Sequence, residues 1–265
     1  MSDQTANPQI QPPLVLAGTK DHLFASDEYP KPFCFNAEVA EVFDDMVSRS
    51  VPLYEEVIRS ICAWSTQFYQ AQTAIYDIGC STGTTLRAVG ETLRANNKPA
   101  RLVGVDPSAE MLEQAEVKLA GCEDFHKVRL EATAAQDLEL SPCSVVLMNY
   151  TLQFLPLGER KTVLRKICQS LVPGGILILS EKIRFETAEF QETTTRIYEQ
   201  FKRVKGYTST EIARKKEALE NVLVPLTAAE QIRVLKAAGF ATVVTTMQWH
   251  NFATFVAQKG DSSDI

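Results

Sequence analysis

The sequence predicts an α/β fold in which helices cover a mostly parallel sheet. Short apolar runs alternate with amphipathic helical segments along most of the chain, and strands separated by helices pair in parallel through right-handed crossovers. A glycine-containing turn follows the first of these runs, where open α/β sheets bind ligands. A chain of 265 residues with 45% hydrophobic residues can bury one large core but hardly two.

The first helical region covers residues 36–64, where apolar residues recur at helical spacing, and Pro52 is expected to interrupt it and start a second helix. Five strands and three helices then alternate, and Pro173-Gly174-Gly175 is expected to turn the chain before the fifth strand. The strands are predicted at 74–78, 101–106, 127–131, 144–150 and 176–180. The helices are predicted at 84–95, 108–119 and 159–171.

The pattern changes after residue 181. Residues 188–222 are almost entirely helical in character and rich in charge, and a further helix over 227–238 ends at Gly239. Two runs of β-branched and aromatic residues, 241–249 and 252–258, predict an antiparallel hairpin with a tight turn at His250-Asn251. The sheet is therefore expected to have seven strands.

The predicted domain organisation is simple. Residues 1–20 are polar and Pro-rich and read as a flexible leader, 21–259 as a single domain, and 260–265 as a polar tail. The start of the chain lacks the basic and apolar stretches of a signal peptide. No apolar run reaches the roughly 20 residues needed to cross a bilayer. We therefore expect a cytoplasmic protein without membrane contact.

Composition excludes other classes of function. A net charge of −6 and a pI of about 5.3 argue against direct nucleic-acid binding, which usually needs a basic surface. The six cysteines are scattered without a Cys-x-x-Cys pair, which predicts reduced thiols and no metal site.

The turn after the first strand reads Asp77-Ile78-Gly79-Cys80-Ser81-Thr82-Gly83. Gly79 allows the backbone to approach a ligand, and Gly83 allows the next helix to pack close to the strand. The pattern is D-x-G-x-x-x-G and not the dinucleotide G-x-G-x-x-G, which favours the amino-acid portion of a ligand over a phosphate. A purely structural turn remains the alternative.

Two polar residues end neighbouring strands. Asp106 ends the second strand, where a carboxylate can accept hydrogen bonds from both hydroxyls of a ribose, although it can equally cap a helix. Asn149 ends the fourth strand and can bind a ligand's amino group or simply satisfy nearby backbone. With the glycine turn, these residues indicate a nucleoside site.

These motifs resemble class I methyltransferases that use S-adenosylmethionine (SAM), and the chain is most similar to the carboxy-SAM synthase family. The resemblance extends from about residue 21 to 258. Its most specific stretches are Arg49-Ser50-Val51-Pro52-Leu53-Tyr54 and Leu219-Glu220-Asn221-Val222, supported by Ser180-Glu181-Lys182 and Phe201-Lys202-Arg203. It implies a Rossmann-like class I methyltransferase fold, with added helices at the N-terminus and over 188–222.

The resemblance implies that SAM is the cofactor, and it also implies which residues contact SAM. Tyr54 reaches SAM from the N-terminal helices, and the segment near 133–135 flanks the adenine. The family carries an aspartate there, whereas this chain reads Glu131-Ala132-Thr133-Ala134-Ala135-Gln136-Asp137. The implied contacts are Tyr54, Gly79, Cys80, Ser81, Asp106, Pro107, Ala134, Ala135 and Asn149.

The family's reaction uses prephenate as carboxyl donor. The methyl group of SAM loses a proton, and the resulting ylide captures the carbon dioxide released as prephenate becomes phenylpyruvate. The reaction needs a water-poor pocket and cations for the carboxylates, but no metal. The candidate catalytic cations are Arg49, Arg203, Arg214 and Lys216.

Lys216 stands where the family has an arginine that pairs with the product's new carboxylate. A lysine offers only a point charge where arginine makes two parallel hydrogen bonds. Lys216 can still perform this role, Arg214 can reach in from one turn away, or the site no longer handles a carboxylate. A solvated helix face is a further alternative for residues 214–216.

Three functions therefore stay open at this point. The first is a carboxy-SAM synthase acting on a small molecule, prephenate or another, whose product serves tRNA wobble-uridine modification. The second is an ordinary methyltransferase, which needs no such cation. The third is a SAM-binding protein without catalysis. The resemblance also implies a homodimer, to which residues 188–222 contribute.

Overall fold

The computed structural model describes residues 19–25 and 32–260. Residues 1–18 of the predicted leader and 261–265 of the predicted tail lie outside these ranges. In the part that is described, no helix is long and apolar enough to cross a membrane.

A single seven-stranded sheet runs through the molecule in the order β3-β2-β1-β4-β5-β7-β6. The first five of these strands pair in parallel, whereas β7 is antiparallel to both of its neighbours. The predicted sheet with its C-terminal hairpin is thus confirmed. The strands are β1 (Ala74–Ile78), β2 (Arg101–Asp106), β3 (Lys127–Ala132), β4 (Cys143–Asn149), β5 (Leu171–Lys182), β6 (Thr242–Trp249) and β7 (Phe252–Gln258).

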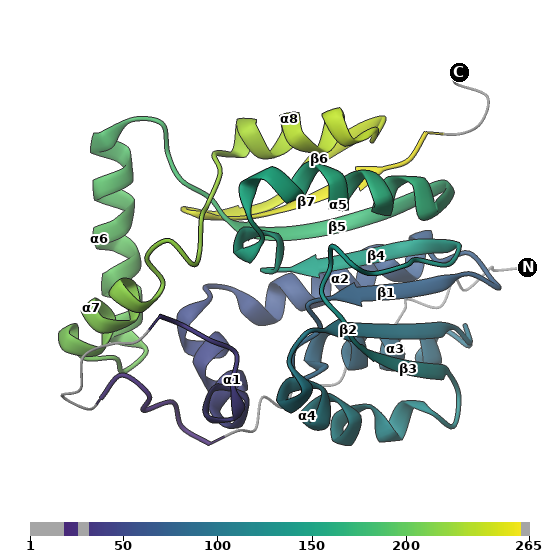
Figure 1. Cartoon of the computed structure of the whole chain (residues 1–265), viewed down its shortest axis with the longest axis horizontal. Helices are drawn as coiled ribbons and strands as arrows, with labels where there is room; N and C mark the ends of the chain where they lie inside the picture. The colour runs from purple at the N-terminus through teal and green to yellow at the C-terminus, as the bar shows by residue number, and fades with distance from the viewer. Residues whose placement is uncertain (1–18, 26–31, 261–265) are drawn as a thin grey trace, which may run out of the picture.

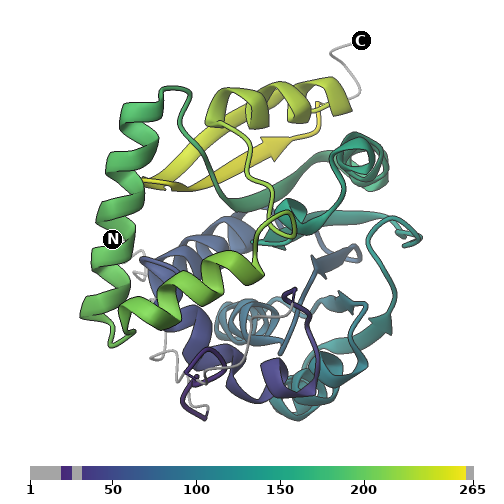
Figure 2. The same ribbon diagram turned by 60° about the vertical axis from the view of Figure 1, so that its left-hand side comes forward.

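Helices pack on both faces of the sheet and beside its end (Figure 1). The helices are α1 (Ala37–Ser50), α2 (Tyr54–Phe68), α3 (Thr84–Ala95), α4 (Ala109–Leu119), α5 (Leu157–Ser170), α6 (Ala188–Val204), α7 (Ser209–Ala218) and α8 (Ala228–Ala238). Turned by 60°, the molecule shows α6 and α7 outside the two helical layers (Figure 2).

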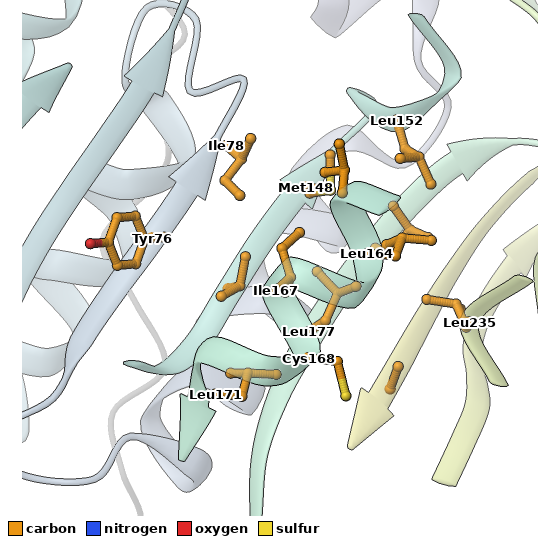
Figure 3. Packing of buried hydrophobic residues seen from close by; sticks show 14 of the residues in the cluster. Tyr76, Ile78, Met148, Leu152, Leu164, Ile167, Cys168, Leu171, Leu177 and Leu235 are labelled. Carbon is orange, nitrogen blue, oxygen red and sulfur yellow. The ribbon is translucent and has the colours of Figure 1, made fainter. Parts of the chain in front are cut away.

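Alternation along the central strands builds two cores. Tyr76, Met148 and Leu177 point toward α5 and α8 and pack with Ile167 and Leu235 (Figure 3). The intervening residues of the same strands, such as Ile75, Val145 and Ile176, pack against α2 and α3 on the other face. Each strand is apolar on both sides, as expected for a parallel sheet covered by helices on both faces.

Two boundaries differ from the sequence prediction. The turn predicted at Pro173-Gly174-Gly175 is wrong, because these residues form a bulge within β5. The pairing jumps from Cys143 with Leu171 to Val145 with Ile176, and Gly174 absorbs the extra length with φ +73°. The helical region predicted over 188–222 is divided into α6 and α7 and ends at Ala218. Gly206, with φ +92°, and the capping box of Thr208 and Glu211 produce the division.

Candidate active site

A cavity of about 1120 Å³ lies at the carboxyl ends of the parallel strands. Ligand pockets commonly have volumes of roughly 300–1,000 Å³, so this cavity has room for two small reactants. The ends of β1, β2, β4 and β5 form one side, and α6, α7 and Phe33–Phe35 enclose it from the other. A backbone hydrogen bond of 2.9 Å from Phe33 N to Ala218 O ties the N-terminal segment to α7.

The cavity has two walls of different composition. The strand wall consists of residues at the ends of β1, β2 and β4, namely Asp77, Gly79, Cys80, Ser81, Asp106, Pro107 and Asn149. The lysine wall consists of residues from the end of β5, α6 and α7, namely Lys182, Tyr198, Lys202, Lys215 and Lys216. All of these residues line the cavity.

Gly79 in the strand wall cannot be replaced without rearrangement. Its φ is +75°, and an added Cβ would lie 2.3 Å from Oγ1 of Thr151. Its backbone N–H donates to Val105 O at 2.7 Å, which draws the turn across the end of β2. Ser81, two residues later in the turn, has φ +51°, a conformation that residues other than glycine rarely adopt. The backbone of the turn thus forms one side of the ligand space.

Asp106 is held in place by the same turn. Its carboxylate accepts hydrogen bonds from the N–H of Ser81 at 2.9 Å and of Ser108 at 3.0 Å. Burial, with 7% of the residue exposed, raises the pKa of this carboxyl group. A carboxylate has about four acceptor positions, so Asp106 keeps capacity for donors on a ligand.

Asp77 is a member of the strand wall that the sequence analysis included in the turn motif but gave no role. The residue is 1% exposed, and neither carboxyl oxygen has a hydrogen-bond partner among the described residues. Burial, followed by the nearby Asp106, raises the pKa of Asp77 to about 7. A buried carboxylate without a partner favours a cationic ligand. An acidic residue inside an otherwise apolar strand is the signal that points to it.

Asn149 and Tyr54 complete this side. The Asn149 amide donates to Thr85 Oγ1 at 3.2 Å, whereas its carbonyl oxygen is buried without a partner among the described residues. Asn149 therefore has an acceptor available for a ligand. Tyr54 begins α2 after Leu53, whose left-handed φ of +54° sets the direction of the helix. Burial, with Asp44 and Asp77 nearby, raises the pKa of Tyr54, so its hydroxyl stays neutral.

The segment after β3 lies at the edge of the cavity. Thr133, Ala134, Ala135 and Gln136 line it, whereas the exposed Asp137 does not. The side chains of Thr133, Ala134 and Ala135 are small, and Gln136 adds an amide beside them.

The lysine wall surrounds an aromatic ring. The ammonium nitrogens of Lys182 and Lys202 lie 5.1 and 4.5 Å from the ring centroid of Tyr198. Burial lowers the pKa of Lys202 to about 7, helped by the positive charges of Lys182 and Lys215. Burial and the charge of Lys216 also lower the pKa of Lys182. Sequence analysis gave neither Lys182 nor Lys202 a role. Lys182 ends a buried strand at the ligand-binding edge, which is a signal that could have identified it.

Lys215 differs from the other lysines because it has partners. Its ammonium donates to Ser50 Oγ at 2.9 Å and lies 3.8 Å from Asp21. Burial lowers its pKa to about 8. Asp21 also accepts a 2.5 Å hydrogen bond from the Tyr207 hydroxyl. Lys215 thus helps to fasten residues near Asp21 onto α7.

Of the four cations predicted to be catalytic, only Lys216 lines the cavity. Arg203 is 49% exposed and lies 3.6 Å from Glu199, because the phase of α6 directs Lys202 inward instead. Arg49 binds Asp45 at 2.6 Å and lies over the Tyr207 ring at 4.1 Å. Arg214 donates to Phe24 O at 3.3 Å. The three arginines are therefore placed for structural contacts in this chain and do not line its cavity.

The described part of the cavity offers neither a metal-binding cluster nor, at Cys80, a reactive thiol. No cluster of three or more His, Cys, Asp or Glu side chains that could hold a metal ion occurs in residues 19–25 and 32–260. Cys80 lines the cavity, but burial and the neighbouring Asp77 raise its pKa well above the usual value. It is therefore a thiol and a poor nucleophile.

The chain is similar to known proteins over most of its length. A family described as "Methyltransferase domain" matches residues 76–177. The chain is 51% identical over 252 residues to the carboxy-S-adenosyl-L-methionine synthase of Trichodesmium erythraeum, covering 95% of this chain and 98% of that protein. It is 41% identical to the synthase of Desulforapulum autotrophicum, covering 91% and 97%.

Solved structures share the fold at low identity. Human N-acetylserotonin methyltransferase in complex with SAM matches with a TM-score of 0.58 at 13% identity, over 84% of this chain and 55% of that one. Magnesium protoporphyrin IX methyltransferase from Synechocystis, with bound SAH, matches with a TM-score of 0.56 at 14% identity, over 81% and 87%. The Rossmann-like methyltransferase fold is thus confirmed.

Proposed function

Because the chain belongs to the carboxy-S-adenosyl-L-methionine synthase family, we propose that it is a SAM-dependent transferase that converts SAM and prephenate into carboxy-SAM and phenylpyruvate. The observation that carries the proposal is the cavity, whose strand wall contains the carboxylates of Asp77 and Asp106 and whose lysine wall contains four lysines. SAM is a cation at its sulfonium and ammonium groups, whereas the carboxyl donor is an anion. Each reactant therefore has a wall of opposite charge.

In this proposal the strand wall holds SAM. Asp106 accepts hydrogen bonds from the ribose hydroxyls with its remaining lone pairs, and the apolar surface of Ala134 and Ala135 lies against the adenine. The turn at Gly79, Cys80 and Ser81 lines the amino-acid end. The unpartnered oxygens of Asp77 and Asn149 give the ammonium group acceptors, which explains why they have none within the described residues.

Bound SAM supplies a methyl group whose C–H bonds are acidified by the neighbouring sulfonium. The protein positions the two reactants and keeps water away from the reacting atoms. Aromatic side chains around the cavity, including Phe33, Phe35 and Phe154, exclude water from the reacting groups. Over the whole reaction one C–H bond of the methyl group is replaced by a C–C bond to the transferred carboxyl carbon. The donor loses carbon dioxide and hydroxide as it becomes phenylpyruvate, and the hydroxide leaves as water with the methyl proton.

Lys216 is the residue of this chain that we assign to the newly formed carboxylate. It lines the cavity, and it stands at the position where the family resemblance places an arginine. A lysine binds a carboxylate through a point charge, so it tolerates a wider range of carboxylate orientations than arginine does. Arg214 does not line the cavity and is not needed for this step.

Three broader properties belong to the same proposal. The product serves tRNA wobble-uridine modification, while the acidic enzyme itself makes no direct contact with nucleic acid. The protein works in the cytoplasm. It is a homodimer in which the region 188–222 takes part, and the exposed Phe190 and Val204 of α6 are apolar groups available for such an interface.

The direct test is to incubate purified protein with SAM and prephenate and to analyse the products by mass spectrometry. We expect phenylpyruvate and a SAM species heavier by one carboxyl group. Unmodified SAM together with intact prephenate would reject the synthase and favour an ordinary methyltransferase acting on another small molecule.

A further inference from the structure

Three lysines of the lysine wall lack a counter-ion within the described residues. Lys182, Lys202 and Lys216 all line the cavity, and no ion pair joins any of them to a carboxylate in residues 19–25 and 32–260. Glu199 lies on the same helix as Lys202, but its carboxylate is 3.6 Å from the guanidinium of Arg203. Glu199, Glu217 and Glu220 also line the cavity, but none of them lies within ion-pair distance of these three ammonium groups in the described residues.

Such an arrangement costs stability unless a ligand compensates it. Lys202 is only 7% exposed, and a buried ammonium without a partner loses its hydration. The ring of Tyr198 offsets part of this loss, since the face of an aromatic ring attracts a cation. The ammonium nitrogens of Lys182 and Lys202 both lie within 5.1 Å of the centroid of that one ring. Two ammonium groups around one ring make this part of the cavity wall attractive to an anion.

The chemistry of the donor decides which carboxylate this is. One carboxylate of prephenate leaves as carbon dioxide, and the other stays in phenylpyruvate. An ion pair to the departing carboxylate would stabilise the ground state and slow its loss. An ion pair to the retained carboxylate holds the donor without this penalty and turns the departing group toward SAM.

We propose that Lys182 and Lys202, beside the Tyr198 ring, bind the carboxylate that the donor retains. This inference rests on the proposed function. It leaves Lys216 for the transferred carboxyl group and Lys215 for its contacts with Asp21 and Ser50. Lys182 and Lys202 are thus specificity-determining residues of the same cavity.

The test uses phenylpyruvate as a probe, because it keeps the retained carboxylate and cannot react further. Its binding to the SAM-loaded protein is measured by calorimetry for the wild type, Lys182→Met and Lys202→Met. Methionine preserves the length of the side chain without its charge. Lys205→Met, at the exposed end of the same helix, is the matched control.

We expect each cavity variant to weaken phenylpyruvate binding and to raise the KM for prephenate by at least about tenfold, while the Kd for SAM and the control variant stay at wild-type values. Lys202→Arg should restore part of the affinity. Unchanged phenylpyruvate affinity in both cavity variants, with an active wild type, would overturn this inference alone. A wild type that forms no carboxy-SAM would instead overturn the proposed function.

Discussion

The strand wall and the lysine wall enclose the same cavity but arise in different ways. Asp77, Asp106 and Asn149 come from β1, β2 and β4, which are neighbours in the sheet, so the fold itself brings them together. The lysine wall combines the end of β5 with two helices that lie outside the layered core. The first wall is thus formed at the ends of neighbouring strands, whereas the second combines Lys182 of the sheet with residues of the added helices.

The walls also differ in how their charges are held. The carboxylate of Asp106 is fixed by two backbone N–H groups, whereas Lys182 and Lys202 have only an aromatic ring in common. A preformed wall can position a cofactor before the second reactant arrives. A wall of unpaired charges is completed only by its ligand. We therefore expect selectivity for the second reactant to depend on the lysine wall.

The largest effect is expected from breaking the strand wall. Asp106→Ala should weaken SAM binding by about 100-fold or more, because each hydrogen bond to a charged acceptor contributes about 1.5–3 kcal/mol. Calorimetry with SAM measures it. Glu110→Ala removes an exposed carboxylate near the start of α4 and serves as a control with no expected change. Unchanged affinity in Asp106→Ala would mean that the ribose is held elsewhere.

A smaller effect is expected from reversing a charge in the lysine wall. Lys216→Glu should weaken carboxy-SAM binding by about 10–100-fold through repulsion of the product carboxylate, and it should leave SAM binding nearly unchanged. Lys216→Arg should preserve or improve carboxy-SAM binding, because arginine can make two parallel hydrogen bonds. Competition between the two nucleosides separates these cases. Equal binding of carboxy-SAM by Lys216→Glu would remove Lys216 from the site.

The two walls should respond to pH in opposite directions. The pKa of Asp77 is raised to about 7, with Asp106, Tyr54 and Cys80 around it, so below pH 7 a cationic ligand must displace a proton. SAM affinity should then rise by up to about tenfold per pH unit below 7 and level off above it. Asp77→Asn should flatten this dependence. A flat profile in the wild type would contradict a role for Asp77 toward the cation.

The lysine wall should determine how activity changes at alkaline pH. Lys202 faces Lys182, Lys215, Lys216 and Glu199, and its pKa in the free protein is about 7. It loses its charge as pH rises through 7, so kcat/KM for the donor should fall on the alkaline side. Lys202→Met should abolish this alkaline decrease in kcat/KM and leave the pH dependence of SAM affinity unchanged. An alkaline decrease in kcat/KM that persists in Lys202→Met would show that another group causes it.

The smallest effect concerns stability without ligands. Since the pKa of Lys202 is lowered from 10.5 to about 7, the unfolded chain holds more protons between these values, and native stability is reduced at neutral pH. Lys202→Met should therefore raise Tm, by about 2–4 °C for each kcal/mol recovered in a chain of this size. Thermal unfolding at pH 7 measures it. A lower Tm would show that the charge stabilises the free protein.

The difference between the walls also explains what the sequence could reveal. Asp106 and Asn149 end apolar runs, and the ends of parallel strands meet at one edge, so the strand wall and the sheet order follow from local patterns. The bulge at Gly174 could not be distinguished from a turn, because both use glycine for a left-handed backbone. Its identification required the pairing of β4 with β5.

The residues of the lysine wall were harder to predict from the sequence. Arg203 was among the candidate cations and Lys202 was not, yet the helical phase that puts Tyr198 in the cavity also puts Lys202 there, four residues later. Arg49 and Arg214 could not be assigned to the N-terminal segment without knowing that Asp21 and Phe24 lie beside them. Such contacts join residues that are far apart in the chain.

The most direct measurement is a crystal structure of the protein with carboxy-SAM bound. We predict that the adenosyl and amino-acid portions lie against the strand wall, with the ribose at Asp106, and that the added carboxylate points to Lys216 in the lysine wall. A nucleoside bound outside this cavity, or one whose carboxylate faces away from the lysines, would contradict the assignment of opposite charges to the two walls.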